Sequence, residues 1–228
     1  MAYDSRKVDP ELGALVHKYL VDNNLETPLN EDGPQLQASE KIARIESHFA
    51  KIMDILGLDL TDDSLVDTPK RVAKMYVNEI FYGLDYDKFP KVTTVENKFD
   101  CDEMVTERGV NVQSNCEHHF IVIDGKAAVS YIPKNKVLGL SKINRIVEFF
   151  AKRPQVQERL TNQIHGALCY ILDTEDVAVV INAQHFCVKS RGIEDANTST
   201  VTSRLSGAFK QPETRAEFMS IVNGSLEL

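Results

Sequence analysis

The spacing of apolar residues changes near Lys91, and this change divides the chain into two regions. Before it, apolar residues recur three and four positions apart, as on one face of an α-helix. Two such series are Leu12, Leu15, Val16 and Leu20, and then Ile42, Ile45, Phe49, Ile52 and Ile55. Asp67-Thr68-Pro69 is typical of a third helix start, with a capping residue and a proline in the first turn. Residues 1–90 are therefore predicted to form an N-terminal helical region.

After Lys91 the chain is rich in β-branched and aromatic residues, which favour strands. The predicted strand segments are KVTTVENKF, EMVTERGVNVQS, HFIVID, KAAVSYIP, DVAVVINAQHFCVKS and TSTVTSRLSGAF. Asp124-Gly125 is predicted to be a hairpin turn between two of them. Two helices follow the first strands, one capped by Ser141 and one opened by Pro154, and TRAEFMSIVNG is predicted to be a terminal helix.

This order of elements favours an α+β fold, in which two helices pack on one face of a four-stranded antiparallel sheet. We assign that domain to residues 91–228. The net charge of −8 disfavours a nucleic-acid partner, because phosphate backbones are held by basic surfaces. No apolar run approaches the roughly 18 residues of a membrane span, and the N-terminus has no signal-peptide pattern. A soluble, cytoplasmic protein without nucleic-acid or membrane partners is expected.

The four cysteines indicate metal binding rather than disulfides, since thiols stay reduced in the cytosol. Cys116 and His119 are three apart, so a tight turn would direct both at one point, and we predict a turn there. His185 and Cys187 are two apart in a strand-like segment, which would place them on one face with Phe186 on the other. Cys116, His119 and Cys187 form a ligand set suited to zinc, with a fourth position left for water.

Other interpretations of these residues stay open at this point. Cysteines are often simply buried, and Cys101 or His118 could complete a closed structural zinc site. In a catalytic site, His118 and His185 could transfer protons. Four basic residues near these segments could hold an anion, namely Lys142, Arg145, Lys189 and Arg191. Ser141, at a predicted helix start, could assist them. The chain has no phosphate-binding loop of the G-x-x-x-x-G-K-[ST] type, which disfavours a kinase or GTPase.

Several segments, in order, resemble the GTP cyclohydrolase I family, especially its bacterial members, from about Asp59 to Phe209. They are DDSLVDTPKRVAKMYVNEIFYGLDY, CEHHF, GKAAVSYIPKNKVLGLSKINRIVEFFAKRPQVQERLT and HFCVKSRG. The resemblance implies the tunnelling fold and a homo-oligomeric ring, commonly a decamer, with active sites at subunit interfaces. It implies conversion of GTP to 7,8-dihydroneopterin triphosphate and formate, the first step of pterin and tetrahydrofolate synthesis.

The resemblance also assigns roles to single residues. It implies one zinc per subunit on Cys116, His119 and Cys187, with His118, His185 and Ser141 acting in catalysis. His118 would protonate the purine nitrogen while zinc activates the water that attacks C8. Glu158 would recognise guanine with Gln157 beside it, and the triphosphate contacts would be Lys142, Arg145, Arg191 and Arg71. Asn115 departs from many relatives, which carry Thr there.

Two different interpretations remain. A structural zinc or scaffolding protein would have a closed metal site and would use the basic groups for an anionic partner. Another pterin or purine enzyme on the same fold would lack GTP ring opening.

Overall fold

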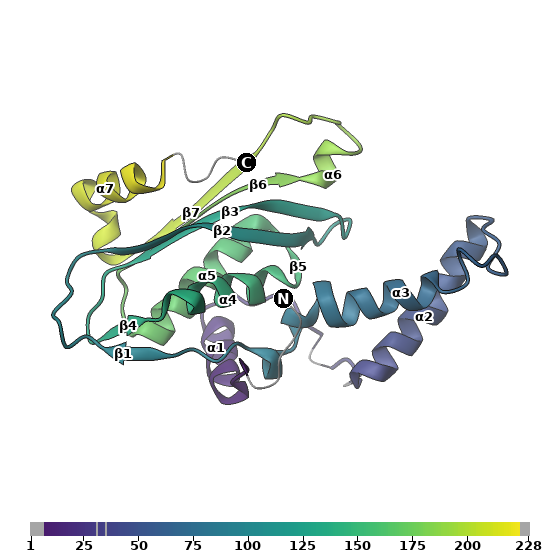
Figure 1. The fold of residues 1–228 in the computed structure, drawn as a ribbon, viewed down its shortest axis with the longest axis horizontal. Coiled ribbons are helices and arrows are strands. Elements are labelled where there is room, and N and C mark those ends of the chain that lie inside the picture. The colour runs from purple at the N-terminus through teal and green to yellow at the C-terminus, as the bar shows by residue number, and fades with distance from the viewer. Residues whose placement is uncertain (1–6, 31, 35, 224–228) are drawn as a thin grey trace.

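The computed structural model describes residues 7–30, 32–34 and 36–223 (Figure 1). Its main sheet has the strand order β5-β2-β3-β6-β7. The four long strands β2 (Val105–Cys116), β3 (Val122–Tyr131), β6 (Val177–His185) and β7 (Thr200–Leu205) are antiparallel neighbours. The short strand β5 (Pro154–Gln155) pairs in parallel with the last residues of β2. The predicted α+β class and the antiparallel four-stranded sheet are confirmed, with β5 as an addition.

Helices cover both faces of this sheet (Figure 1). α4 (Leu140–Ala151) and α5 (Gln157–Leu172) pack on one face, as predicted. The 3-10 turn η5 (Gly207–Lys210) and α7 (Pro212–Val222) pack on the other. Each face of the sheet has its own hydrophobic core, because successive side chains of β3 point to opposite faces. Ala127 and Val129 belong to the core under α4 and α5, whereas Ala128 belongs to the core with Phe209 under α7.

The N-terminal helices divide into two groups. α1 (Pro10–Asp22) packs against α5, and its Val16 and Leu20 are fully buried in the main core. α2 (Ala38–Ile55) and α3 (Thr68–Met75) form a helix pair that projects from the sheet domain (Figure 1). Three short turns lead from α3 back to the main body, namely η2 (Tyr76–Ile80), η3 (Tyr82–Leu84) and η4 (Tyr86–Lys88). Residues 1–6 and 224–228, at the outer ends of the two predicted regions, lie outside the described residues.

A buried arginine anchors the segment that leads into β5. Arg153 has no exposed surface, and its guanidinium donates to Glu26 at 3.0 Å and to the Tyr86 hydroxyl at 3.3 Å, and also to the Gly83 carbonyl. It also lies 5.0 and 4.9 Å from the ring centroids of Phe149 and Phe150. The loop after α1 is thereby tied to the end of α4, directly before β5.

The predicted hairpin turn at Asp124-Gly125 is wrong, because both residues lie inside β3 and pair with β2 and β6. Gly125 is required by close packing instead of by a turn. A Cβ there would lie 2.2 Å from the carbonyl oxygen of Asn182 on β6. The true β2–β3 connection is residues 117–121. A further short pair, β1 (Thr94–Glu96) with β4 (Lys136–Leu138), precedes α4.

Two predicted helix starts also need correction. Ser141 is not the cap of α4, because the helix already begins at Leu140 and Gly139 is its cap residue. Pro154 does not open α5, since the proline belongs to β5 and the helix begins at Gln157. Pairing with the end of β2 takes Pro154 and Gln155 from the helix.

A β-bulge at Gly109 sets the direction of the side chains in the second half of β2. Gly109 has φ of +72°, and the pairing with β3 shifts by one residue between Arg108 and Val110. After the bulge, alternate residues are buried down to the end of the strand, and they are Val110, Val112, Ser114 and Cys116. Cys116 therefore faces inward at the last position of β2.

Among the described residues, no helix combines the length and apolar character needed to cross a bilayer.

Candidate metal centre

The connection from β2 to β3 is the tight turn that the spacing of Cys116 and His119 predicts. The Phe120 N–H donates to the Cys116 carbonyl, and the Cys116 N–H donates to the Ile121 carbonyl, both at 2.8 Å. Phe120 takes a left-handed conformation with φ of +54°, which closes the turn. The Asn115 side chain donates to the Phe120 carbonyl at 3.1 Å, which stabilises the turn.

Cys187 lies beside this turn, but on a helical turn and not on the strand that the sequence predicts. The prediction that His185 and Cys187 share one face of a strand is wrong, because β6 ends at His185 and residues Phe186–Lys189 form a single helical turn, α6. The Ser190 N–H donates to the Phe186 carbonyl at 2.9 Å and closes that turn. His185 still pairs with Ile123 near the start of β3, which keeps α6 beside the β2–β3 turn.

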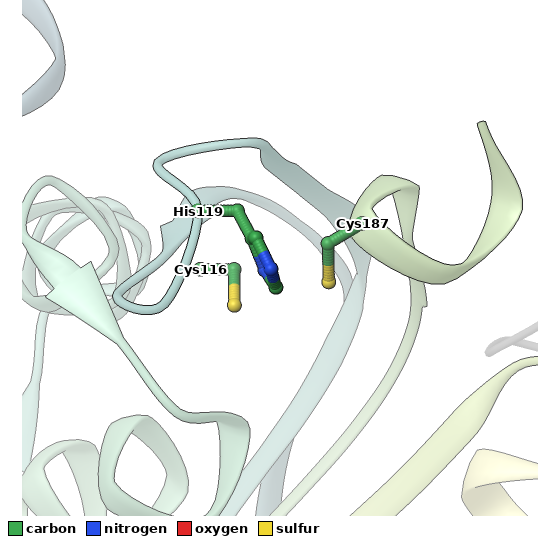
Figure 2. A group of neighbouring side chains, drawn as sticks. All are labelled: Cys116, His119 and Cys187. Carbon is green, nitrogen blue, oxygen red and sulfur yellow. The ribbon is translucent and has the colours of Figure 1, made fainter. Parts of the chain in front are cut away.

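The three predicted ligand residues come together at this end of the sheet (Figure 2). One ligand atom from each of Cys116, His119 and Cys187 lies within 4.8 Å of the others. The Cys116 thiol is buried, Cys187 is half-buried and His119 is exposed. Two thiols and one imidazole at this spacing fit zinc, and three protein ligands leave one tetrahedral position for water or substrate.

Arg191 contributes a positive charge beside the cluster. Its guanidinium donates to Nε2 of His119 at 2.9 Å, which fixes a positive charge beside the thiols. Burial raises the pKa of the Cys187 thiol, and the neighbouring Cys116 raises it further, whereas Arg191 acts in the opposite direction. Thiolates this close repel each other unless a cation lies between them.

Two further histidines border the cluster. Nδ1 of His118 lies 3.5 Å from the Cys116 sulfur, and its ring is largely exposed. Nε2 of His185 lies 2.8 Å from the side-chain oxygen of Gln157, at the first position of α5. Burial lowers the pKa of His185, and the Glu158 carboxylate opposes that shift.

The start of α5 thus presents one buried and one exposed residue to the cluster. Gln157 is 1% exposed, and its amide nitrogen donates to the Ile181 and Thr200 carbonyls and to the Thr202 hydroxyl. The next residue, Glu158, is exposed. The Glu158 side chain is therefore open to solvent, whereas the Gln157 side chain is already engaged inside the protein.

The structure does not bring the basic residues of α4 to the metal cluster within one chain. The Leu138 N–H, two residues before α4, donates to the Tyr131 hydroxyl at 2.8 Å, and Tyr131 pairs with Val105 at the first position of β2. Cys116 is the last of the 12 residues of β2. At about 3.3 Å per residue the two ends of β2 are roughly 35 Å apart. Ser141 and Lys142 begin α4 at that distant end, and Arg145 lies one turn further on.

Arg71 lies on the projecting helix α3. Its side chain is 73% exposed, and it forms an ion pair with Asp67 at 3.5 Å.

The fourth cysteine that could close a structural site lies elsewhere. The Asn97 side chain donates to the carbonyls of Cys101 and Lys134, which places Cys101 beside the chain that leaves the far end of β3. Cys101 therefore lies at the end of the sheet opposite Cys116. In the described part of the chain, the group able to hold a metal contains Cys116, His119 and Cys187 and not Cys101.

Sequence reasoning missed one ion pair at the site. Arg159 on α5 contacts both carboxylate oxygens of Glu117, at 2.5 and 3.5 Å. The partners are 42 residues apart, so no local spacing signals the pair.

Comparison with known proteins gives one consistent result. The family model for GTP cyclohydrolase I matches residues 45–223. The chain is 58% identical over 209 residues to GTP cyclohydrolase 1 of Yersinia pseudotuberculosis serotype O:1b (strain IP 31758), covering 91% of this chain and 94% of that protein. It is 59% identical over 210 residues to GTP cyclohydrolase 1 of Edwardsiella ictaluri (strain 93-146), covering 92% of this chain and 94% of that protein. For GTP cyclohydrolase 1 of Aliivibrio fischeri (strain MJ11) the identity is 56% over 211 residues, covering 92% and 96%.

Proposed function

The chain belongs to the GTP cyclohydrolase I family and has that activity, the first step of pterin and folate biosynthesis, and from this premise we propose how its residues carry it out. The observation that carries the proposal is the cluster of Cys116, His119 and Cys187. We propose one zinc ion per subunit on these three ligands. When bound, the ion supplies Lewis-acid activation of water near neutral pH. The products are formate and 7,8-dihydroneopterin triphosphate.

His118 and His185 are proposed to move protons during ring opening. His118 is exposed beside Cys116, so its ring can approach a substrate held at the metal and protonate the purine nitrogen. His185 is held by Gln157 at the start of α5, and it is proposed to assist proton transfer from there.

The guanine base is proposed to lie at the start of α5. The exposed carboxylate of Glu158 can accept two hydrogen bonds from the guanine edge. Gln157 lies beside it, and its side chain contributes to this subsite through His185. A base at Glu158 places the purine ring between α5 and the metal ligands.

The triphosphate and ribose contacts are proposed to come partly from a second subunit. Arg191 lies at the metal cluster, but Ser141, Lys142 and Arg145 lie at the opposite end of β2, and Arg71 projects on α3. A single chain therefore cannot use all of these residues on one GTP molecule. We propose a homo-oligomeric ring, a decamer, in which one subunit supplies the metal and its neighbour supplies Ser141, Lys142, Arg145 and Arg71.

We further propose that the protein has the tunnelling fold, that its domain boundary lies between residues 90 and 91, and that it is cytoplasmic. The antiparallel sheet with α4 and α5 on one face supports the proposed fold. The nucleotide substrate supports the proposed location.

The test is to incubate zinc-loaded protein with GTP, quantify formate, and measure the fluorescent pterin after oxidation and dephosphorylation. Formate and pterin in equal amounts support the proposal. Formate without pterin would contradict the assigned ring closure, and metal-bound protein that yields neither would contradict the proposed site.

A further inference from the structure

The first turn of α5 is fastened to the metal-ligand turn by the ion pair between Arg159 and Glu117. The Arg159 guanidinium meets both carboxylate oxygens, at 2.5 and 3.5 Å, so the contact is two-pronged and fixes an orientation as well as a distance. The side chains are 21% and 26% exposed. Both side chains are therefore partly shielded from solvent, which favours a single geometry, although neither lies in the hydrophobic core.

Glu117 lies in the turn that carries the candidate ligands Cys116 and His119, so the placement of Glu117 affects the orientation of both. It lies between the ligand Cys116 and the exposed His118. Its backbone N–H donates to the Gln155 carbonyl at 3.0 Å, which adds a main-chain tie to β5. Its side chain then ties the same residue to α5, so Glu117 is held from two elements.

Arg159 occupies the corresponding position on the helix. It directly follows Gln157 and Glu158, and Gln157 holds His185 at 2.8 Å. The first three residues of α5 therefore contact β6 through His185, present the Glu158 carboxylate, and contact the metal turn through Arg159. A shift of this helical turn would move both halves of the metal centre.

We propose that Arg159 is a positioning residue, which acts through Glu117 to set the metal ligands relative to Glu158. The inference rests on the proposed function, because it assigns the guanine subsite to Glu158. A partly exposed ion pair contributes little to folding, because solvent screens the charges and ordering both side chains costs entropy. Groups that orient metal ligands, by contrast, typically change metal affinity or activity about 10- to 100-fold when removed. The pair therefore acts on the geometry of the site and leaves folding almost unchanged.

The test compares Arg159→Gln, Glu117→Gln, their double variant and Arg159→Lys as full-length protein. Zinc affinity is measured by competition with a chromophoric chelator, and ligand geometry by the visible absorption of the cobalt-substituted protein. Steady-state kinetics with GTP give kcat and KM separately. Lys18→Gln is the matched control, because Lys18 forms an exposed ion pair with Asp22 at 2.6 Å on α1.

We expect Arg159→Gln and Glu117→Gln each to reduce zinc affinity or kcat about 10- to 100-fold, with KM within about threefold. The cobalt spectrum should change, and circular dichroism should not. The double variant should be no worse than either single variant, because both remove the same interaction. Arg159→Lys should recover part of the loss, and Lys18→Gln should stay within about twofold of the parent.

Three results would overturn the proposal. One is unchanged zinc affinity, spectrum and kcat in Arg159→Gln. Another is additive losses in the double variant, which would show that the residues act independently. The third is a raised KM in Arg159→Gln alone, which would make Arg159 a direct substrate contact. Zinc affinity and the cobalt spectrum do not depend on turnover, so failure of the GTP reaction in the parent protein would be recognised separately.

Discussion

The side-chain oxygen of Gln157 lies 2.8 Å from Nε2 of His185, while the amide nitrogen of the same side chain donates to one main-chain carbonyl of β6 and one of β7. Replacement by leucine removes one hydrogen-bond partner from each of these buried or partly buried groups. We expect Gln157→Leu to lower the free energy of unfolding by about 1–3 kcal/mol. Activity should also fall, because His185 loses the group that orients it. Urea denaturation and kcat measure the two effects, and Thr202→Val, which removes one of the partners, should cost less stability.

Removal of a thiol ligand should abolish metal binding. In Cys187→Ala and in Cys116→Ala the cluster keeps one thiol and one imidazole, and we expect zinc to fall from about one per subunit to near zero, with loss of turnover. Cys101→Ala is the control, because Cys101 lies at the other end of the sheet. Metal analysis after dialysis distinguishes the variants. Loss of zinc from Cys101→Ala would instead indicate a closed structural site.

The proposal that neighbouring subunits share each active site predicts complementation. Lys142→Gln and Cys187→Ala should each be inactive as pure oligomers. When equal amounts are dissociated and reassembled together, roughly a quarter of the sites receive an intact metal half and an intact α4, so activity should reappear near that fraction. An equal mixture of Cys116→Ala and Cys187→Ala is the control, because both changes affect the same half. Mixed oligomers without recovered activity would mean that one subunit supplies both halves.

A buried histidine predicts the direction of an acid-induced loss of stability. His165 is 6% exposed, and burial, together with the positive charge of Arg204, lowers its pKa from 6.5 to about 4. Between these pH values the unfolded chain binds a proton that the folded protein excludes. The free energy of unfolding should therefore fall as pH decreases from about 6.5 to about 4, by at most about 3 kcal/mol from this group.

The measurement is urea denaturation at fixed protein concentration between pH 7 and pH 4.5. Nε2 of His165 lies 2.7 Å from the Ser206 hydroxyl. The variant His165→Gln keeps a polar partner for that hydroxyl, and glutamine does not titrate. We expect a flatter pH dependence in this variant. Equal slopes in the two proteins would show that other groups cause the acid sensitivity.

Local patterns predicted the parts of the site that depend on local structure. The turn at Cys116 and His119 follows from a spacing of three residues, and it is confirmed by the Phe120-to-Cys116 hydrogen bond. The helical turn at Cys187 was missed, because Phe186 and Val188 favour strands by themselves, whereas the chain must leave the sheet after His185. The ion pair of Glu117 with Arg159 depends wholly on the assembled fold.

The same distinction explains the errors in the fold. Enrichment in β-branched and aromatic residues identified the sheet, and apolar residues at helical spacing identified α4 and α5, although the predicted start of each helix was wrong. Asp124-Gly125 has the composition of a turn, but the glycine serves the close approach of β6 to β3. Pro154 has the features of a helix start, yet pairing with β2 places it in β5. In both cases a contact distant in sequence outweighed a local preference. The boundary at residues 90 and 91 stays a prediction.

The bulge at Gly109 bears on which changes in length the chain can accept. Between this bulge and Cys116, side chains alternate strictly between the buried and exposed faces, apart from Asn115 at the strand end. A substitution in this stretch alters one side chain. An insertion or deletion of a single residue reverses the direction of every side chain after it, and the thiol of Cys116 would then point to the wrong face. Natural variation that keeps the metal centre is therefore restricted in the length of this segment more strictly than in its composition.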